Sequence, residues 1–317
     1  MRFVLLAAAL LIVTLWAVPT GGCGVIGGGA KATPTPTPTP TATATPTATP
    51  TPTPIPMIDT PVLEALQGGY AAVRVSAAAS SAVATFEGAE YPLLAREGGF
   101  WGIIGVAADH ATGAYPVGVS LRDASGSAFA TLDATLTVFG AGYPVEQIYL
   151  GPEESQLLDP SLSAQEEATR ERVFSAFTPE RLWSGAFILP STGPISSPYG
   201  IGRSYNGAPV SSFHHGTDFQ ADEGAPVVAS NAGRVAYAAA LPIRGNSVII
   251  DHGGGVFTGY HHLVSITVTD GQEVAQGDLV GYVGATGLAT GPHLHWELIV
   301  RGIAVDPVLW TYEEIGP

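Results

Sequence analysis

The sequence predicts a mainly β protein in which an export signal and a linker precede two β-rich domains. Residues 57–177 contain short runs typical of strands, among them "AAVRV", "FWGIIGV" and "YPVGVSL", separated by turn-forming stretches such as "EGG" and "DASGS". Near the C-terminus, "HLHWELIV", a turn at "RG" and then "IAVDPVLW" predict a strand that turns and returns. The spacing of the runs favours a β-sandwich-like domain over βαβ units in residues 57–177. The second domain is expected at residues 178–317.

Residues 1–23 are typical of an export signal. One basic residue precedes an apolar run from Phe3 to Val18, and small residues then lead to Cys23, the only cysteine. The run has about 16 residues, fewer than the roughly 20 that span a bilayer as a helix. "TGGC" resembles a bacterial lipobox, although Thr20 stands where such motifs usually have Leu. We expect a protein exported to the cell envelope and held at the membrane by a lipid on Cys23, with ordinary secretion or an uncleaved signal anchor as alternatives.

Residues 24–56 are expected to form a linker. Proline recurs at nearly every second position in "TPTPTPTPTATATPTATPTPTP", residues 33–54. Proline lacks a backbone donor and has a fixed φ, so we expect an extended, polyproline-like spacer. At roughly 3.1 Å per residue, this spacer would hold the following domains some 70 Å from their anchor.

One helix is predicted at the end of the first domain, in "SAQEEATRERVFSAF", which begins at Ser163. Ser163 and Glu166 fit a capping box, and Glu166 is also placed to pair with Arg170 one turn later. The only histidine of this domain, His110, lies in the turn-like "ADHATG" and is expected in solvent at the surface. No chemistry is assigned to the first domain, which would space, target or occlude the second one.

Charge and missing motifs exclude several classes of function. The formal net charge is −15 and Lys31 is the only lysine, whereas nucleic-acid binding needs clustered basic residues. "VTDGQEVAQGDLVGYVG" resembles the hairpins of biotinyl and lipoyl carrier domains, but a carrier needs a lysine that this region lacks. The H-E-x-x-H motif of thermolysin-type peptidases and the G-x-S-x-G motif of serine hydrolases are absent from the sequence.

The histidines are concentrated in the second domain, because all except His110 lie between His214 and His295. Such a concentration favours a metal or catalytic site, since neutral imidazole is the commonest transition-metal ligand. In "FHHGTDF", His214 and Asp218 are four residues apart and share one face of the segment. A carboxylate with imidazoles suits Zn²⁺, and three protein ligands that leave a fourth position to water are typical of a catalytic site.

The period of a β-strand selects among the remaining histidines. Alternate side chains of a strand share a face, so His293, His295 and Glu297 point one way while Leu294 and Trp296 point the other. The apolar face needs burial. The histidine face is therefore free to line a groove.

Residues 187–317 resemble the lysostaphin-like (LytM-type) zinc metallopeptidases, bacterial enzymes that cut peptide bonds in the peptidoglycan stem or cross-bridge. The matching motifs are, in order, "SPYG", "FHHGTDF", "GAPVVASNAGRV", "GYHHL" and "VTDGQEVAQGDLVGYVGATGLATGPHLHWEL". The ordered combination of H-x-G-x-D, Y-x-H-L and T-G-P-H-L-H-W is highly specific. The resemblance implies an antiparallel β-rich fold of the duplicated hybrid motif type. Arg203 lies in "PYGIGRSYNG", whose spacing departs from the usual G-x-R of the family, and its role stays open.

The resemblance also implies roles for five residues. His214, Asp218 and His295 match the three zinc ligands of the family, and one zinc per chain is expected. His262 and His293 match its two further active-site histidines, one beside the attacking water and one near the developing oxyanion. The implied activity is hydrolysis of peptidoglycan peptide bonds by a zinc-activated water. The alternative is a non-hydrolytic wall-binding or regulatory module with a structural zinc, but retention of every ligand position favours the enzyme.

The other polar residues of this domain are expected to have structural roles. His215 and His261 adjoin site residues and are interpreted as structural or solvent-facing. His252, Asp251 and Asp270 lie next to glycines and are interpreted as turn formers. The bond that is cut, the choice of general base between the two assisting histidines and the oligomeric state stay open.

Overall fold

The computed structural model describes residues 55–156 and 159–317. The predictions for the export signal, its lipobox cysteine and the proline-rich repeats concern residues outside this part of the chain. The predicted mainly β class is confirmed, with 48% of residues in strands and 9% in helices. Across the described residues, no helix combines the length and the apolar character needed to cross a membrane.

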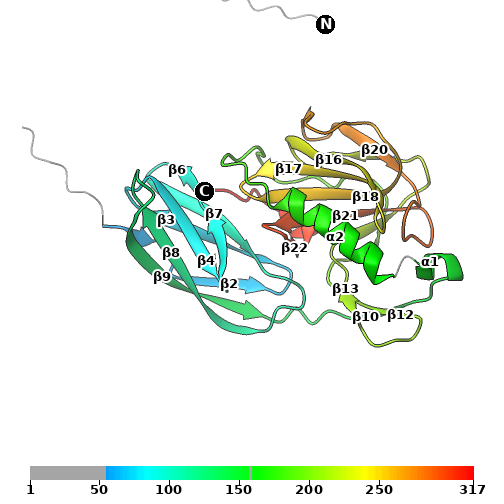
Figure 1. Cartoon of the computed structure of the whole chain (residues 1–317), viewed down its shortest axis with the longest axis horizontal. Helices are drawn as coiled ribbons and strands as arrows, with labels where there is room; N and C mark the ends of the chain where they lie inside the picture. Colours follow the sequence, from blue (N-terminus) through cyan, green and yellow to red (C-terminus); the bar gives the residue numbers. More distant parts are fainter. Residues whose placement is uncertain (1–54, 157–158) are drawn as a thin grey trace, which may run out of the picture. The chain divides into compact units, whose positions relative to one another are not determined.

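Residues 57–139 form two sheets around one core (Figure 1). The four-stranded sheet has the order β1 (Met57–Ile58), β3 (Tyr70–Ser76), β7 (Gly99–Gly105) and β6 (Leu94–Arg96). The five-stranded sheet has the order β2 (Val62–Leu66), β9 (Ala128–Phe139), β8 (Gly113–Arg122), β4 (Ser81–Phe86) and β5 (Ala89–Pro92). Both sheets bury alternate side chains in the same cluster, which includes Val73, Ile104 and Leu136. This is the sandwich-like arrangement that the strand pattern predicts.

A ten-stranded antiparallel sheet carries the predicted site residues. Its main path runs through β11 (Ile195–Ser197), β14 (Thr217–Gln220), β21 (His293–Val300), β18 (Val256–Ile266), β17 (Gly245–Gly253), β16 (Gly233–Leu241) and β19 (Glu273–Val274). Off this path lie β15 (Pro226–Val228), β20 (Leu279–Val283) and β22 (Ile303–Val305). Phe219, Tyr260, Leu294 and Trp296 are fully buried in the core of this sheet. Leu294 and Trp296 therefore supply the packed face of β21, as its two-residue period predicts.

A short three-stranded sheet joins segments from before and after the helices. It consists of β10 (Val145–Ile148), β12 (Gly202–Tyr205) and β13 (Ser212–Phe213). Strand β10 pairs in parallel with β12, and Val145 lies opposite Gly202. The structure thus places a strand that precedes the helices beside the part of the chain that carries the site histidines.

Helix α2 (Pro160–Phe174) starts earlier than the sequence predicts. It follows the short helix α1 (Pro152–Gln156), and a 3₁₀ helix, η1 (Pro307–Thr311), lies near the C-terminus. The N-cap of α2 is Asp159, whose side chain accepts the backbone N–H of Ser161 at 2.7 Å. Pro160 follows as the first helical residue, where its fixed φ suits the first turn. The predicted capping box at Ser163 is therefore wrong. The predicted pairing of Glu166 with Arg170 is also wrong, since both side chains are buried against other partners.

A shared hydrophobic cluster links the four-stranded sheet to the ten-stranded sheet. Trp101 of β7 and Trp183 meet edge to face, with ring centroids 6.0 Å apart. Leu298 of β21 and Trp310 of η1 belong to the same cluster and are fully buried. Burial of large aromatic side chains is among the strongest apolar contributions to stability. The C-terminal end of β21, the strand that carries His293 and His295, is thus packed against residues of the four-stranded sheet.

Candidate metal site and groove

Strands β14 and β21 bring the predicted metal ligands together. Asp218 lies directly opposite His295 in the antiparallel register of the two strands. His214 precedes β14, and its Nε2 lies 3.0 Å from Oδ1 of Asp218 and 3.0 Å from Nδ1 of His295. The His295 Nδ1 and the same Asp218 oxygen are 2.8 Å apart. The three ligand atoms, which come from β14, β21 and the loop before β14, therefore lie within 3.0 Å of one another.

This donor set fits a divalent metal. In a tetrahedral zinc site with bonds of about 2.0–2.1 Å, ligand atoms lie roughly 3.4 Å apart, a few tenths of an ångström more than the separations observed here. The Nδ1 of His214 lies 2.9 Å from the carbonyl oxygen of Pro198, and donation to that carbonyl leaves Nε2 as the metal-binding atom. Burial by itself would raise the pKa of Asp218, but the imidazoles of His214 and His295 hold that pKa well below its usual range. The carboxylate is therefore ionised, as a metal ligand must be.

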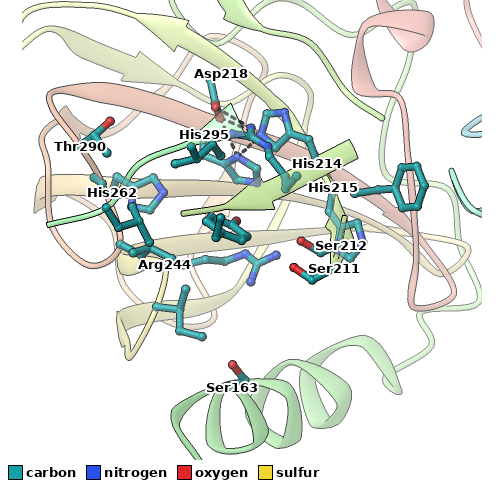
Figure 2. A pocket seen from close by; sticks show the side chains of 18 of the residues that line it. Ser163, Ser211, Ser212, His214, His215, Asp218, Arg244, His262, Thr290 and His295 are labelled. Atoms are coloured by element: carbon teal, nitrogen blue, oxygen red, sulfur yellow. Dashed lines mark hydrogen bonds and ion pairs between the residues drawn. The ribbon is translucent and has the colours of Figure 1, made fainter. Parts of the chain in front are cut away.

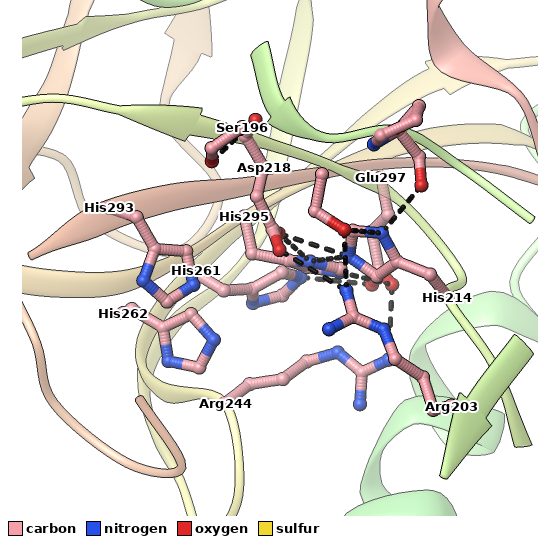
Figure 3. Close-up of polar contacts among 12 residues, drawn as sticks. Ser196, Arg203, His214, Asp218, Arg244, His261, His262, His293, His295 and Glu297 are labelled. Carbon is pink, nitrogen blue, oxygen red and sulfur yellow. Dashed lines mark hydrogen bonds and ion pairs between the residues drawn. The ribbon is translucent and has the colours of Figure 1, made fainter. Parts of the chain in front are cut away.

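His262 and His293 lie next to each other beside the triad of His214, Asp218 and His295 (Figure 3). Their ring centroids are 4.7 Å apart, and the rings of His262 and His295 are 6.1 Å apart. The Nδ1 atom of His262 lies 2.8 Å from the carbonyl oxygen of Thr286. Likewise, the Nδ1 of His293 lies 2.9 Å from the carbonyl oxygen of Gly291. Donation of both Nδ1–H groups to backbone leaves both Nε2 atoms free for chemistry.

Comparison with known proteins places this site in a family. Residues 212–307 match peptidase family M23. They form an M23 peptidase domain. The predicted resemblance to lysostaphin-like peptidases is thereby confirmed.

The similarity to curated relatives concerns the M23 domain. The chain is 48% identical over 93 residues to the peptidoglycan DD-endopeptidase ShyA of Vibrio cholerae, a match that covers 29% of this chain and 22% of that protein. It is 40% identical over 114 residues to the DD-carboxypeptidase/endopeptidase Mpg of Neisseria meningitidis, covering 36% of this chain and 26% of that protein. The chain thus spans only 22% and 26% of the length of these relatives.

A solved structure matches most of the described chain. It is the crystal structure of a Pseudomonas aeruginosa protein assigned to peptidase M23, 28% identical to this chain. The match covers 80% of this chain and 95% of that chain, with a TM-score of 0.60. The similarity therefore extends beyond the M23 domain into the preceding residues.

The site of the M23 domain opens into a groove (Figure 2). Two hollows, of about 760 and 540 Å³, meet at the site and share Arg203, Asp218 and His293 in their walls. Ile148 of β10 lines both hollows, and Ser163 of α2 lines the larger one. Residues that precede the M23 domain therefore form part of the groove wall.

Arg203 contacts the carboxylate of Asp218, a role that its sequence spacing left open. Its guanidinium lies 3.3 Å from Oδ2 of Asp218 and 3.2 Å from Oε2 of Glu146 on β10. The oxygen of Asp218 that faces Arg203 is the one turned away from the two histidines. The arginine therefore orients the carboxylate from outside the triad.

A buried ionic cluster beneath the M23 site was missed by sequence reasoning. Glu297, two residues after His295 on β21, is fully buried and accepts from Arg170 (2.9 Å), Arg244 (3.2 Å) and His261 (2.9 Å). The strand period correctly placed Glu297 on the histidine face. The signal available in the sequence was a carboxylate on the same strand face as two site histidines. A carboxylate that is buried there needs an opposite charge beside it.

Several structural interpretations of polar residues need correction. His252 and Asp251 are not turn residues, because β17 extends to Gly253 and the turn follows it. The His252 ring is fully buried, with contacts to the Ala232 carbonyl (2.7 Å) and the Thr258 hydroxyl (2.8 Å).

Three other histidines and Asp270 differ in their exposure to solvent. His110 is half-buried rather than solvated, and it lies 2.9 Å from a Glu87 oxygen. His261 is fully buried as a structural residue. His215 is exposed at the groove wall and Asp270 lies in a turn, as the sequence predicts.

Proposed function

We propose that this protein is an exported zinc metalloendopeptidase that hydrolyses peptide bonds in peptidoglycan stem peptides or cross-bridges. The observation that carries the proposal is the convergence of His214, Asp218 and His295 at an open groove, with free Nε2 atoms of His262 and His293 beside them. The names of the M23 relatives, which include a peptidoglycan DD-endopeptidase, support the same substrate class.

In this proposal His214, Asp218 and His295 hold one zinc ion, and a fourth position is left to water. When bound, zinc would lower the pKa of a water to about 7 and polarise the scissile carbonyl. Of His262 and His293, one accepts the proton of the attacking water and the other donates to the developing oxyanion. The Nδ1–H groups of both rings donate to backbone carbonyls, which hold the rings in place.

The rest of the chain would deliver this activity to the wall. We propose that residues 1–23 direct export, that a lipid on Cys23 anchors the chain to the membrane, and that the linker at 24–56 spans the distance to the wall. Residues 57–177 would form the β domain and residues 178–317 the peptidase domain. Strand β10 and helix α2 line the groove, which favours close cooperation between these two parts.

The test uses purified residues 57–317. We expect about one bound zinc per chain and new peptide ends when isolated sacculi are digested. His293→Ala is expected to retain zinc but to lose turnover by about 100-fold, because it removes a proton-transfer group and no ligand. Sequencing the ends released from walls of defined chemistry identifies the bond. Zinc binding without new ends from walls of several cross-link types would favour the wall-binding module instead.

A further inference from the structure

Helix α2 lies outside residues 212–307, yet it sends two charged side chains into the M23 domain. Most side chains of the helix are exposed, but Glu166 is 2% exposed and Arg170 is 6% exposed. Burial of a charge is costly unless the charge is paired and hydrogen-bonded. The partners of these two side chains therefore indicate what the helix does.

Glu166 holds the turn between β16 and β17. Its Oε2 accepts the backbone N–H groups of Ile243 at 2.7 Å and of Arg244 at 3.0 Å. Its Oε1 pairs with the guanidinium of Arg244. Since a buried amide without a partner costs about 1–3 kcal/mol, one carboxylate oxygen that satisfies two amides fixes the path of the turn.

The same turn holds the backbone of His262. The carbonyl oxygen of Arg244 accepts the N–H of His262 at 2.9 Å. His262 has a φ of 61°, a left-handed conformation that persists in a non-glycine residue only where its surroundings enforce it. Two consecutive contacts, from Glu166 to the backbone of Arg244 and from Arg244 to the backbone of His262, thus lead from α2 to an assisting histidine. Figure 2 shows Arg244 between His262 and the helix that carries Ser163.

Arg170 ties the same helix to the strand of the metal ligands. Its guanidinium donates to Glu297 at 2.9 Å, and Arg244 donates to the other oxygen of Glu297 at 3.2 Å. Together with Glu166, these residues form a cluster of two carboxylates and two guanidinium groups, whose charges balance. Arg170 therefore gives α2 a second buried contact with the M23 domain, separate from the contact of Glu166 with the turn.

We propose that Glu166 is a positioning residue for the M23 site, which aligns the imidazole of His262 through the turn at residues 243–244. The inference rests on the proposed peptidase function for its kinetic readout. In this role α2 supports the geometry of the site, although the helix precedes the M23 domain. What matters in this role is the reach of the carboxylate to two backbone amides.

Two substitutions in the full chain separate reach from charge. Glu166→Asp keeps the charge but is one methylene shorter, so it cannot reach both amides from the same helix position. Glu166→Gln keeps the reach to the two amides through its remaining oxygen, but it removes the charge and places an NH2 group where the oxygen that pairs with Arg244 lies. We expect Glu166→Asp to lower kcat about tenfold, with KM and zinc affinity within about twofold of the parent, and Glu166→Gln to stay within about threefold in kcat. Glu171→Asp, the same change at an exposed position of the same helix, is the matched control and should have the parent kcat.

The imidazole ¹⁵N signals of His262 provide a readout that does not depend on turnover. They should shift in Glu166→Asp and match the parent in Glu166→Gln and Glu171→Asp. If the parent releases no peptide ends, the peptidase proposal fails while these signals still test the inference. Parent kcat with unchanged His262 signals in Glu166→Asp would overturn it, as would a larger loss in Glu166→Gln than in Glu166→Asp. Failure of Glu166→Asp to fold would assign Glu166 to the fold and would also overturn the inference.

Discussion

Gly216 permits the close approach of the loop before β14 to His295 on β21, which we propose as a metal ligand. A Cβ at this position would lie 2.4 Å from the carbonyl oxygen of Trp296 and 2.8 Å from the His295 ring. Real Cβ contacts essentially never fall below 3.0 Å, so the backbone would have to move by about 0.6 Å or displace the ring. Because the atom at 2.4 Å belongs to the backbone, no side-chain rotation can relieve the contact.

Gly216→Ala is therefore expected to weaken zinc binding at least about tenfold. Metal–ligand distances tolerate only about 0.2 Å, so a shift of about 0.6 Å between His214, Asp218 and His295 exceeds what the site can absorb. The overpacking should cost about 1–3 kcal/mol of folding stability, so we expect the variant to fold. Competition with a chromophoric chelator measures the affinity, and chemical denaturation measures the stability.

A matched control uses the same substitution where space is available. Gly118 lies on β8, and a Cβ there would meet nothing within 4 Å. Gly118→Ala should bind zinc with the parent affinity. A folded Gly216→Ala protein that also binds zinc with the parent affinity would refute the reasoning, because it would mean that His295 does not need its observed position to hold the metal.

Three further predictions concern stability and anchoring. Burial lowers the pKa of His252 from 6.5 to about 4. Between these two pH values the unfolded chain binds more protons than the folded chain, so up to about 3 kcal/mol of stability is lost as pH falls from 6.5 towards 4. His252→Gln should therefore lose less stability than the parent between pH 7.5 and pH 5 in denaturant titrations, and parallel curves would contradict this. Arg170→Met should cost about 3 kcal/mol or more, because it leaves Glu297 with less compensation for its buried charge, whereas the exposed Arg172→Met should stay within about 0.5 kcal/mol. If Cys23 is lipidated, Cys23→Ser should release the protein from membranes into the medium, and unchanged retention in cell fractionation would identify the apolar segment as the anchor.

The strand of the site histidines could be predicted because its pattern is local. Side chains alternate along any strand, so "HLHWEL" alone places His293, His295 and Glu297 on one face. The structure confirms this, with Leu294 and Trp296 in the core on the other face. The family resemblance added the partners of this strand, and the register of β14 against β21 brings them within reach.

The roles of Glu166 and Arg170 could not be predicted in the same way. The rule for neighbouring turns of a helix suggests that they pair with each other, because they are four residues apart. In the structure they pair with Arg244 and Glu297, which lie 78 and 127 residues further along the chain. A charge that is buried pairs with whichever opposite charge is buried beside it, and that choice depends on the packing of α2.

By itself, the sequence determined the mainly β class, the faces of the histidine strand and the five positions at which an M23 site would be built. Only the tertiary structure decided that β10 and α2 line the groove, that Glu297 is neutralised by two arginines, and that the turn at residues 243–244 holds His262. The physical reason is the range of the interactions. Periodicity and motif spacing follow from the geometry of a few consecutive residues, whereas contacts between distant segments exist only when the complete fold buries both partners together.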